Sequence, residues 1–319
     1  MISYICKYVN LDNPLNMYDI AIVGSGPAGY SAGIYASRYQ LKTIIFGKMV
    51  GGTTSEAHKI CNYPGFPEIT GLDLSVKMYE HAKELGCEMK FESVTNVEKI
   101  DDHLKITTDI GTEYTAKTVL LTIGTERTKL SIPDEDKFLG KGLSYCATCD
   151  ANFYRDKIVG VIGGSSAATM ASMMLSDIAK KVYIIYRGNE LRGDPAWKKQ
   201  VLANEKIEVL YNTVIIGLEG GERLQSLKLN RDYGGSNILP VDGVFIEIGS
   251  EPNKNLPEKI ALKTDKKGYI VVDHEQKTSI EGIWAAGDCT TNSNEFRQVI
   301  TAVSEGGIAA NDIYKYLNS

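Results

Sequence analysis

The chain has few of the residues and patterns that would mark it for an unusual environment. Its 319 residues include 9 prolines, 4 histidines, 6 cysteines and 2 tryptophans, and its formal net charge is −5. An acidic balance provides no basic surface for nucleic acid. No apolar run reaches the roughly 18 residues that a membrane span needs. Residues 1–17 lack the basic start and unbroken apolar core of a signal peptide, so we expect an N-terminal extension and a cytoplasmic protein.

The scarcity of histidine and of paired cysteine helps to decide what the segment Cys146-Ala147-Thr148-Cys149-Asp150 does. A Cys-x-x-Cys pair is either half of a zinc site or a redox-active dithiol. The other cysteines are scattered singly and the four histidines form no ligand pattern, so we predict no metal site and a redox pair. Two thiols at this spacing close a disulfide easily, and one of them usually has a lowered pKa that makes it a nucleophile. Asp150 follows directly as a candidate general acid or base.

A nucleotide-binding signature opens the main part of the chain. Tyr18–Val23 is a short apolar run typical of a buried parallel strand. The Gly-x-Gly-x-x-Gly turn comes next and is formed by Gly24, Ser25, Gly26, Pro27, Ala28 and Gly29. The first glycine permits the turn, the second lets a pyrophosphate approach the backbone, and the third lets a helix over about 28–39 pack closely. In this strand-turn-helix context the signature predicts a bound dinucleotide, although the acidic residue expected after the second strand, at Lys42–Phe46, is missing.

A second signature is altered. The apolar run at 157–162 leads into Gly163-Gly164-Ser165-Ser166, so serine stands where a phosphate would come nearest to the backbone. That serine adds bulk, yet its hydroxyl can donate a hydrogen bond to a phosphate. The strand at 181–186 is followed by Arg187 and Arg192, which either read a 2′-phosphate or are solvated surface residues. Nucleotide binding is therefore predicted to be weakened or changed rather than excluded.

Near the C-terminus, the stretch 279–288 reads as a strand that ends in Gly287-Asp288, before a helix that begins around Arg297. An aspartate at that strand end is placed to bind a ribose or ribityl hydroxyl, or else it caps a turn. A C-terminal helix with small residues is expected beyond 304.

Taken together and in order, these motifs resemble those of the low-molecular-weight thioredoxin reductases, which are flavoprotein disulfide reductases; the resemblance covers the chain from Met17 onward. It implies an α/β fold of two Rossmann-like three-layer domains, the second inserted into the first. The implied FAD-binding domain is 18–127 with 254–319, and the pyridine-nucleotide-binding-like domain, which carries the cysteine pair, is 128–253. The polar segments 125–129 and 251–255 suit a hinge between them. The resemblance also implies FAD contacts at the first glycine motif and at Gly47, Gly51, Gly52, Thr53, Asn62, Gly124, Gly287, Asp288, Arg297, Gln298 and Val299.

By the same resemblance, electrons pass from NADPH through FAD to the Cys146–Cys149 pair and on to thioredoxin or a thioredoxin-like protein. Cys149 is then the flavin-side thiol and Cys146 the nucleophile toward the partner, and the protein is a homodimer. The donor site, predicted at Gly163, Ser165, Ser166, Arg187 and Arg192, departs from the family pattern by one glycine and one arginine. Thr53 also stands where the family commonly has glutamine.

These departures leave the electron donor open. Ferredoxin or a reduced deazaflavin is the alternative to NADPH within the same reductase activity. Two further hypotheses are a dithiol oxidase that passes electrons from a small dithiol to oxygen, and a non-enzymatic flavin redox sensor that docks a partner when the cysteine pair changes state.

Overall fold

The computed structural model describes residues 17–293 and 296–319, so the predicted N-terminal extension lies almost wholly outside the described residues. The described chain divides into two compact units. One contains the described residues through Ser55, then Ile60–Thr125 and Pro252–Ser319 as far as they are described, and the other contains Glu56–Lys59 and Glu126–Glu251. Strands β7 (Thr125–Arg127) and β16 (Ser250–Pro252) pair where the chain leaves and re-enters the first unit, and they overlap the two segments predicted as a hinge.

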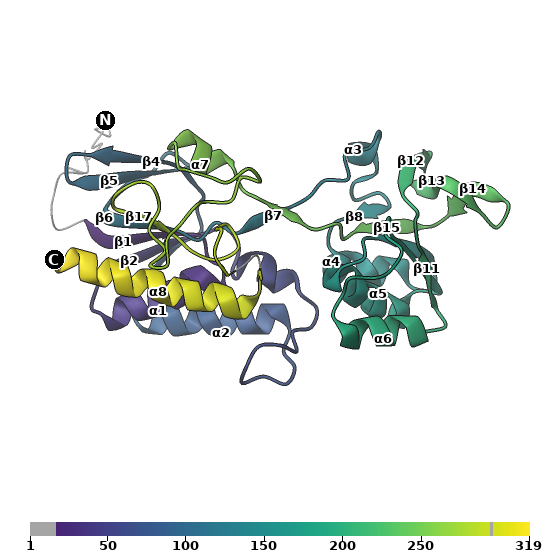
Figure 1. Ribbon diagram of the computed structural model, residues 1–319, viewed down its shortest axis with the longest axis horizontal. Helices are drawn as coiled ribbons and strands as arrows, with labels where there is room; N and C mark the ends of the chain where they lie inside the picture. Colours follow the sequence, from purple (N-terminus) through teal and green to yellow (C-terminus); the bar gives the residue numbers. More distant parts are fainter. Residues whose placement is uncertain (1–16, 294–295) are drawn as a thin grey trace, which may run out of the picture. The chain divides into compact units, whose positions relative to one another are not determined.

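The first unit is built on a mixed sheet whose strand order is β3-β2-β1-β6-β5-β4, with β17 also paired to β6 (Figure 1). Strands β1, β2, β3, β6 and β17 pair in parallel, and β4 and β5 form an antiparallel extension. Their bounds are β1 (Tyr18–Val23), β2 (Thr43–Phe46), β3 (Glu88–Lys90), β4 (Val94–Ile100), β5 (His103–Thr108), β6 (Glu113–Leu121) and β17 (Ile283–Ala285).

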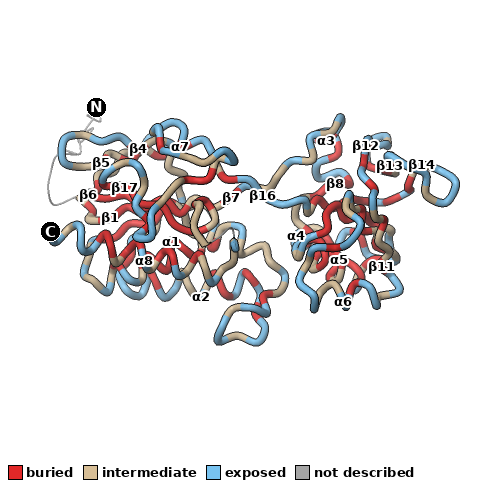
Figure 2. The backbone as a smooth tube through the Cα atoms, in the orientation of Figure 1, coloured by how far each residue is buried: buried red, intermediate tan, exposed pale blue. Residues whose placement is uncertain are grey.

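Helices cover one face of this sheet, as Figure 1 shows for α1, α2 and α8. The helical elements of the unit are α1 (Pro27–Arg38), the 3₁₀-helix η2 (Gly52–Glu56, whose last residue packs with the second unit), α2 (Gly71–Glu84), α7 (Asn255–Lys259) and α8 (Val299–Leu317). Because side chains alternate along a strand, Ile20 and Ile22 of β1 pack with α1 and α8, whereas Ala21 and Val23 pack with β4, β5 and α7 on the other face. The central strands are therefore buried on both sides (Figure 2).

The second unit repeats this plan with a parallel sheet of order β11-β10-β9-β15-β8. Helices α5 and α6 pack on one face, and an antiparallel sheet of β12, β13 and β14 packs on the other. The strands are β8 (Leu143–Ser144), β9 (Ile158–Ile162), β10 (Lys181–Ile185), β11 (Ile207–Leu210), β12 (Ile215–Gly220), β13 (Leu224–Tyr233), β14 (Ser236–Pro240) and β15 (Gly243–Ile246). The helices are α3 (Glu135–Phe138), α4 (Ala147–Asp150), η3 (Ala151–Tyr154), α5 (Ser166–Ile178) and α6 (Pro195–Ala203).

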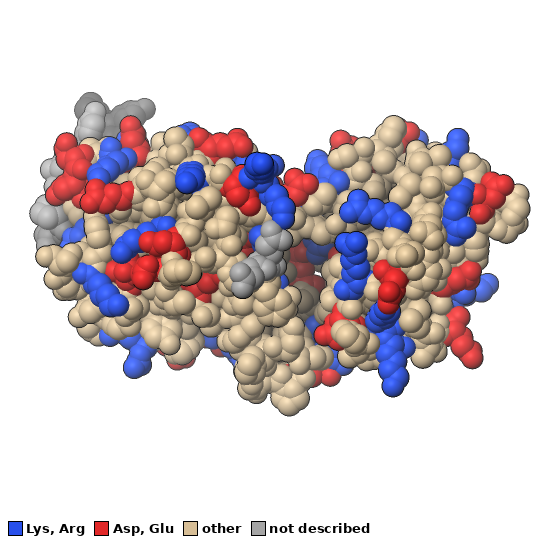
Figure 3. Space-filling model, viewed as in Figure 1, with Lys and Arg blue, Asp and Glu red and all other residues tan. Residues whose placement is uncertain are grey.

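Several predicted bounds move by a residue or two, and the C-terminal elements change more. The expected strand over 279–288 is only Ile283–Ala285, because residues 279–282 form a turn and Gly287 has a positive φ of 83°. The expected C-terminal helix is a single helix from Val299 to Leu317. None of the helices in the described part of the chain is both long and apolar enough to span a bilayer. On the face drawn in Figure 3, lysine and arginine are interspersed with aspartate and glutamate on both units.

Close packing of α1 against α8 depends on Gly306. A Cβ atom added there would lie 2.1 Å from the backbone oxygen of Ala28, whereas one at Gly307 would first meet the ring of the half-exposed Tyr35 at 3.2 Å. We expect Gly306→Ala to lower the free energy of unfolding by about 1–3 kcal/mol, the usual cost of overpacking. Gly307→Ala is the matched control and should change it by less than about 1 kcal/mol, since alanine also favours the helix. Urea unfolding of both variants tests this, and equal losses would contradict it.

Candidate active site

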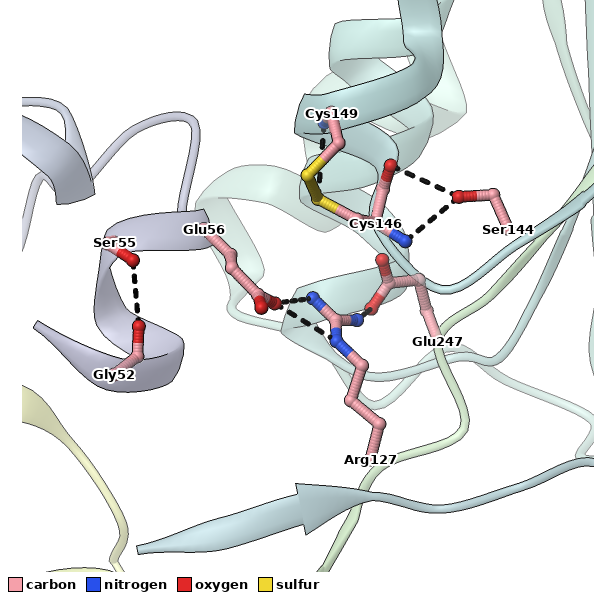
Figure 4. Close-up of a disulfide and its surroundings, with 8 residues drawn as sticks. All are labelled: Gly52, Ser55, Glu56, Arg127, Ser144, Cys146, Cys149 and Glu247. Carbon is pink, nitrogen blue, oxygen red and sulfur yellow. Dashed lines mark hydrogen bonds and ion pairs between the residues drawn. A yellow bond between two sulfur atoms is a disulfide. The ribbon is translucent and has the colours of Figure 1, made fainter. Parts of the chain in front are cut away.

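The cysteine pair lies just beyond the carboxyl end of β8. Cys146 and Cys149 form a disulfide with an S–S distance of 2.04 Å. Cys146 is the N-cap of α4, and its Sγ accepts a hydrogen bond from the backbone N–H of Cys149 at 3.1 Å. Ser144 fixes the approach to the helix, since its Oγ accepts from the Cys146 N–H at 3.0 Å and donates to the Cys146 carbonyl at 3.2 Å (Figure 4). Cys146 is half-buried and Cys149 is exposed, so a partner thiol can reach the disulfide.

The residue before the pair is anchored by a second network. The hydroxyl of Tyr145 donates to the buried carboxylate of Glu135 and accepts from the Leu130 N–H at 2.9 Å. The Ser131 N–H donates to the same carboxylate at 2.6 Å. Burial, followed by the hydrogen bond to Glu135, raises the pKa of Tyr145 to about 12. The phenol therefore stays a neutral donor and holds the chain beside Cys146 in place.

Asp150 ends helix α4 and is half-buried. Its backbone N–H donates to the Cys146 carbonyl at 3.2 Å, which places the residue on the turn that carries the disulfide. Within the described residues its carboxylate makes no hydrogen bond to either sulfur. Its role as general acid or base stays a prediction.

Sequence reasoning missed a carboxyl group on the neighbouring strand. Strand β15 pairs in parallel with β8 through Phe245 and Ser144, and Glu247 and Cys146 each lie two residues beyond that pair, at the carboxyl edge of the sheet. The side chain of Glu247 is 10% exposed and lies 3.4 Å from the Arg127 guanidinium, which also binds Glu56 at 2.5 Å (Figure 4). Burial raises the pKa of Glu247 to about 7, against the lowering effect of Arg127. A glutamate directly after a buried strand, Gly243–Ile246, was the signal available in the sequence.

The glycines of the first turn have two different roles: some are required by the protein's own packing, and one leaves open space. A Cβ at Gly24, where φ is +126°, would lie 2.1 Å from the Thr122 carbonyl oxygen, and one at Gly29 would lie 2.0 Å from the Gly24 oxygen. These two glycines are required by the protein's own packing. A Cβ at Gly26 would meet only the Gly51 oxygen, at 3.8 Å. Gly26 also starts α1 without a side-chain cap, so its open space and the free helix N–H groups suit an approaching phosphate.

Other predicted FAD contacts gather around this turn. Ser25 donates to the Met49 carbonyl at 2.7 Å and its own carbonyl accepts from the Gly51 N–H at 2.8 Å. A Cβ at Gly47 would lie 2.0 Å from Ser25 Oγ, so Gly47 is needed for this contact. A Cβ at Gly52 would lie 3.8 Å from the Gly26 Cα. The exposed Thr53 lies in η2.

The C-terminal motif, Gly287-Asp288 with Arg297 and Gln298, packs against the first glycine turn. A Cβ at Gly287 would lie 3.0 Å from the Ala28 Cβ. Burial raises the pKa of Asp288 to about 6, with the charge of Arg297 acting against this. Arg297 Nε donates to the Asp288 carbonyl at 3.2 Å. Gln298 caps α8, which begins at Val299, and accepts from Asn62 at 3.0 Å, so Asn62 and the C-terminal motif are in contact. Gly124, with φ of +60°, precedes β7 and has open space at its Cβ position.

The altered second turn keeps the backbone of the first. Ser165 has φ −89° and ψ −177°, against −88° and −175° at Gly26, and it likewise begins its helix, α5, without a side-chain cap. Gly163 is needed here, since a Cβ would lie 2.1 Å from the Glu247 oxygen. Ser166 Oγ accepts from the Asp194 N–H at 3.0 Å, which leaves its own hydroxyl proton to donate.

The two predicted phosphate-reading arginines lie on the loop that follows β10. This loop is tied to the second turn, because the Arg192 N–H donates to the Gly164 carbonyl at 2.7 Å. Arg187 and Arg192 are both exposed, and neither forms an ion pair with another described residue. Two unpaired guanidinium groups beside a helix N-terminus can receive a phosphate.

Two units, each with a strand-glycine-helix start, and a disulfide on one of them define a class of nucleotide-dependent disulfide oxidoreductases. The family model described as pyridine nucleotide-disulphide oxidoreductase matches residues 18–306, and the chain belongs to this family. A thioredoxin reductase of Peptoclostridium litorale is 39% identical over 311 residues, which cover 95% of this chain and 98% of the relative. The resemblance stated from the sequence is thereby confirmed.

Solved structures agree with this. The thioredoxin reductase of Lactococcus lactis matches with a TM-score of 0.89 and 34% identity, covering 94% of this chain and 99% of that one. A ferredoxin-flavin thioredoxin reductase of Clostridium acetobutylicum is 34% identical over 95% of this chain and 98% of its own, with a TM-score of 0.51. The predicted fold class, two Rossmann-like domains with one inserted into the other, is confirmed.

Proposed function

We propose that the chain is an FAD-dependent thioredoxin reductase that passes electrons to the Cys146–Cys149 disulfide and from there to thioredoxin or a thioredoxin-like protein. The observation that carries this proposal is the accessible disulfide at the carboxyl edge of the parallel sheet of the second unit. The chain of that unit is inserted into the first unit, which has its own strand-glycine-helix start. Family membership and the thioredoxin reductase relatives support it.

The residues of the first unit fit FAD. Gly26 leaves open the space that a Cβ would fill, at the N-terminus of α1, and the half-buried Asp288 follows Gly287, which packs against Ala28 of the same helix. The proposed FAD-binding domain is accordingly 18–127 with 254–319, and 128–253 is the domain that carries the redox pair. Bound FAD supplies two-electron transfer between the donor and the disulfide.

The chain's own residues then perform thiol–disulfide exchange. One reduced sulfur attacks the partner's disulfide, one partner thiolate leaves, and the second sulfur closes on the first to release the reduced partner. By family assignment Cys146 attacks the partner and Cys149 faces the flavin. Asp150 is proposed to move the proton that the leaving thiolate needs. Ser144 and Tyr145 hold the turn in place through their hydrogen bonds.

NADPH is the proposed donor. The second turn keeps the backbone of the first at Ser165, and Ser166 offers a hydroxyl proton. Arg187 and Arg192 supply positive charge and form no ion pair with any described residue. Ferredoxin is a second candidate, favoured by the added side chain at Ser165 and by the similarity to the ferredoxin-flavin thioredoxin reductase.

The donor is tested by adding NADPH, NADH or reduced ferredoxin to the holoenzyme without oxygen and following loss of oxidised-flavin absorbance. We expect bleaching by NADPH at micromolar concentration. Arg187→Gln and Arg192→Gln should each raise the NADPH concentration needed by about tenfold, because a charged hydrogen bond to phosphate contributes about 1.5–3 kcal/mol. Lys199→Gln, an exposed charge change on α6, is the control. Bleaching by ferredoxin alone would overturn the NADPH assignment and leave the reductase activity intact.

A homodimer is also proposed. Helix α8 exposes Ile300, Ile308, Tyr314 and Tyr316, and Tyr35 on α1 is likewise half-exposed. Such apolar side chains on packed helices suit a contact with a second copy. Light scattering after gel filtration should give twice the monomer mass of 35.0 kDa. A cytoplasmic location stays a prediction from the sequence.

A further inference from the structure

The carboxyl group of Glu247 lies next to the redox turn and has no role in the proposed exchange. It directly follows β15, which pairs with the strand that leads into the redox turn, and Figure 4 shows Glu247 beside Cys146. Its backbone is fixed, since its N–H donates to the Ile162 carbonyl at 2.8 Å and its own carbonyl lies against Gly163. A carboxyl group near a pair of thiols changes how easily the thiols ionise.

The Glu247 side chain is enclosed and only partly neutralised. It is 10% exposed, and its charged partner, Arg127, lies 3.4 Å away but is engaged more closely by Glu56, at 2.5 and 3.1 Å (Figure 4). Burial raises the pKa of this carboxyl to about 7, Arg127 lowers it and Glu56 raises it further. A carboxyl group whose pKa is raised in this way changes charge nearer to the pH at which thiols exchange than an exposed glutamate does.

We propose that Glu247 is a positioning residue that sets the thiolate content of the reduced Cys146–Cys149 pair, by holding a pH-dependent negative charge beside it. This inference rests on the proposed function and concerns a residue that the sequence motifs do not include. Breaking the disulfide takes two electrons from the proposed flavin donor. The product is two thiols if two protons are taken up, and one thiol with one thiolate if only one is taken up.

The sign follows from the neighbouring charges. A carboxylate near a thiol disfavours the thiolate and raises the thiol pKa, whereas a protonated carboxyl does not. The other groups that face this region are Arg127 from β7, Glu56 from η2, Tyr145 before α4 and Asp150 at its end; the turn after β9, Gly163–Ser166, has no titratable side chain. As pH rises through the pKa of Glu247, the thiolate fraction of the pair should therefore rise less steeply than that of a thiol with no carboxyl group nearby.

Alkylation of the reduced holoenzyme tests this without donor or thioredoxin. The protein is reduced with a phosphine, desalted, and exposed to iodoacetamide between pH 5.5 and 9, and modification of Cys146 is read by peptide mass spectrometry. In the unmodified chain we expect a shoulder near neutral pH in the plot of log rate against pH. Glu247→Gln should remove the shoulder and speed alkylation above pH 7.5 by about three- to tenfold, since about one pKa unit is typical of a nearby like charge.

Two further variants keep the result specific. Glu247→Asp retains the charge and should retain the shoulder, while Glu222→Gln, at an exposed position in the same unit, should match the unmodified chain. Superimposable profiles for Glu247→Gln and the unmodified chain, or an equal shift in Glu222→Gln, would overturn the inference. If Glu247→Gln does not fold, the unmodified chain alone still tests the inference: a straight plot of log rate against pH with unit slope below the thiol pKa would overturn it. The alkylation experiment does not measure thioredoxin reduction. A failure of the proposed function would appear in the thioredoxin assay, and a failure of this inference would appear only in the alkylation profiles.

Discussion

Gly26→Val is expected to give a folded protein that has lost its flavin. The Cβ position at Gly26 is open to within 3.8 Å of the Gly51 oxygen, so the protein itself tolerates a side chain there. A valine would occupy the space in which a pyrophosphate approaches the N-terminus of α1. We expect FAD affinity to fall by about 100-fold or more, equivalent to about 3 kcal/mol. The flavin-to-protein absorbance ratio of the purified variant, together with its circular dichroism, measures this.

Gly24→Ala is the control for that experiment. Its Cβ would lie 2.1 Å from the Thr122 carbonyl oxygen in a backbone with φ of +126°, so this variant should lose the fold together with the flavin. A Gly26→Val protein with a full complement of FAD would show that the cofactor does not lie at this turn.

Cys146→Ser is expected to abolish thioredoxin reduction while leaving flavin reduction by the donor unchanged. Serine cannot form the disulfide that joins Cys146 to Cys149, so the electrons have no route from flavin to partner. Turnover should fall by about 10³-fold or more, as for other essential nucleophiles. Stopped-flow bleaching and a thiol-release assay, run on the same preparation, separate the two steps.

Cys61→Ser provides the comparison, because Cys61 is an exposed free thiol. It should turn over at the rate of the unmodified chain. Residual thioredoxin reduction in Cys146→Ser, or a large loss in Cys61→Ser, would mean that electrons leave through another thiol.

The sequence predicted the parts of this structure that depend on local pattern. The run Tyr18–Val23 and the glycines after it specify a buried strand and a tight turn, and both are found. The second turn could be recognised despite Ser165, because an apolar run and Gly163 precede it as in the first turn; the backbone at Ser165 does repeat that of Gly26. The expected strand over 279–288 was too long, since apolar composition does not reveal that Gly282 and Gly287 adopt positive φ.

What the sequence could not predict depends on contacts between distant residues. Glu247, Arg127 and Glu56 belong to three separate stretches, and only the pairing of β15 with β8 brings the first of them to the sheet edge that also carries Cys146. The Tyr145–Glu135 pair likewise depends on how the loop at Leu130 folds back. The position of Glu247 directly after a buried strand could have drawn attention to that residue, but its contact with Arg127 carries no periodic signal and is visible only once the fold is known.

Electrons are proposed to leave the chain through Cys146 to a thioredoxin disulfide. Covalent trapping tests this: Cys149→Ser is mixed with a thioredoxin whose single remaining active-site cysteine carries a thionitrobenzoate group. We expect release of one thionitrobenzoate per chain and a one-to-one mixed disulfide that peptide mass spectrometry maps to Cys146. An adduct that maps to Cys61, or no adduct at all, would contradict it.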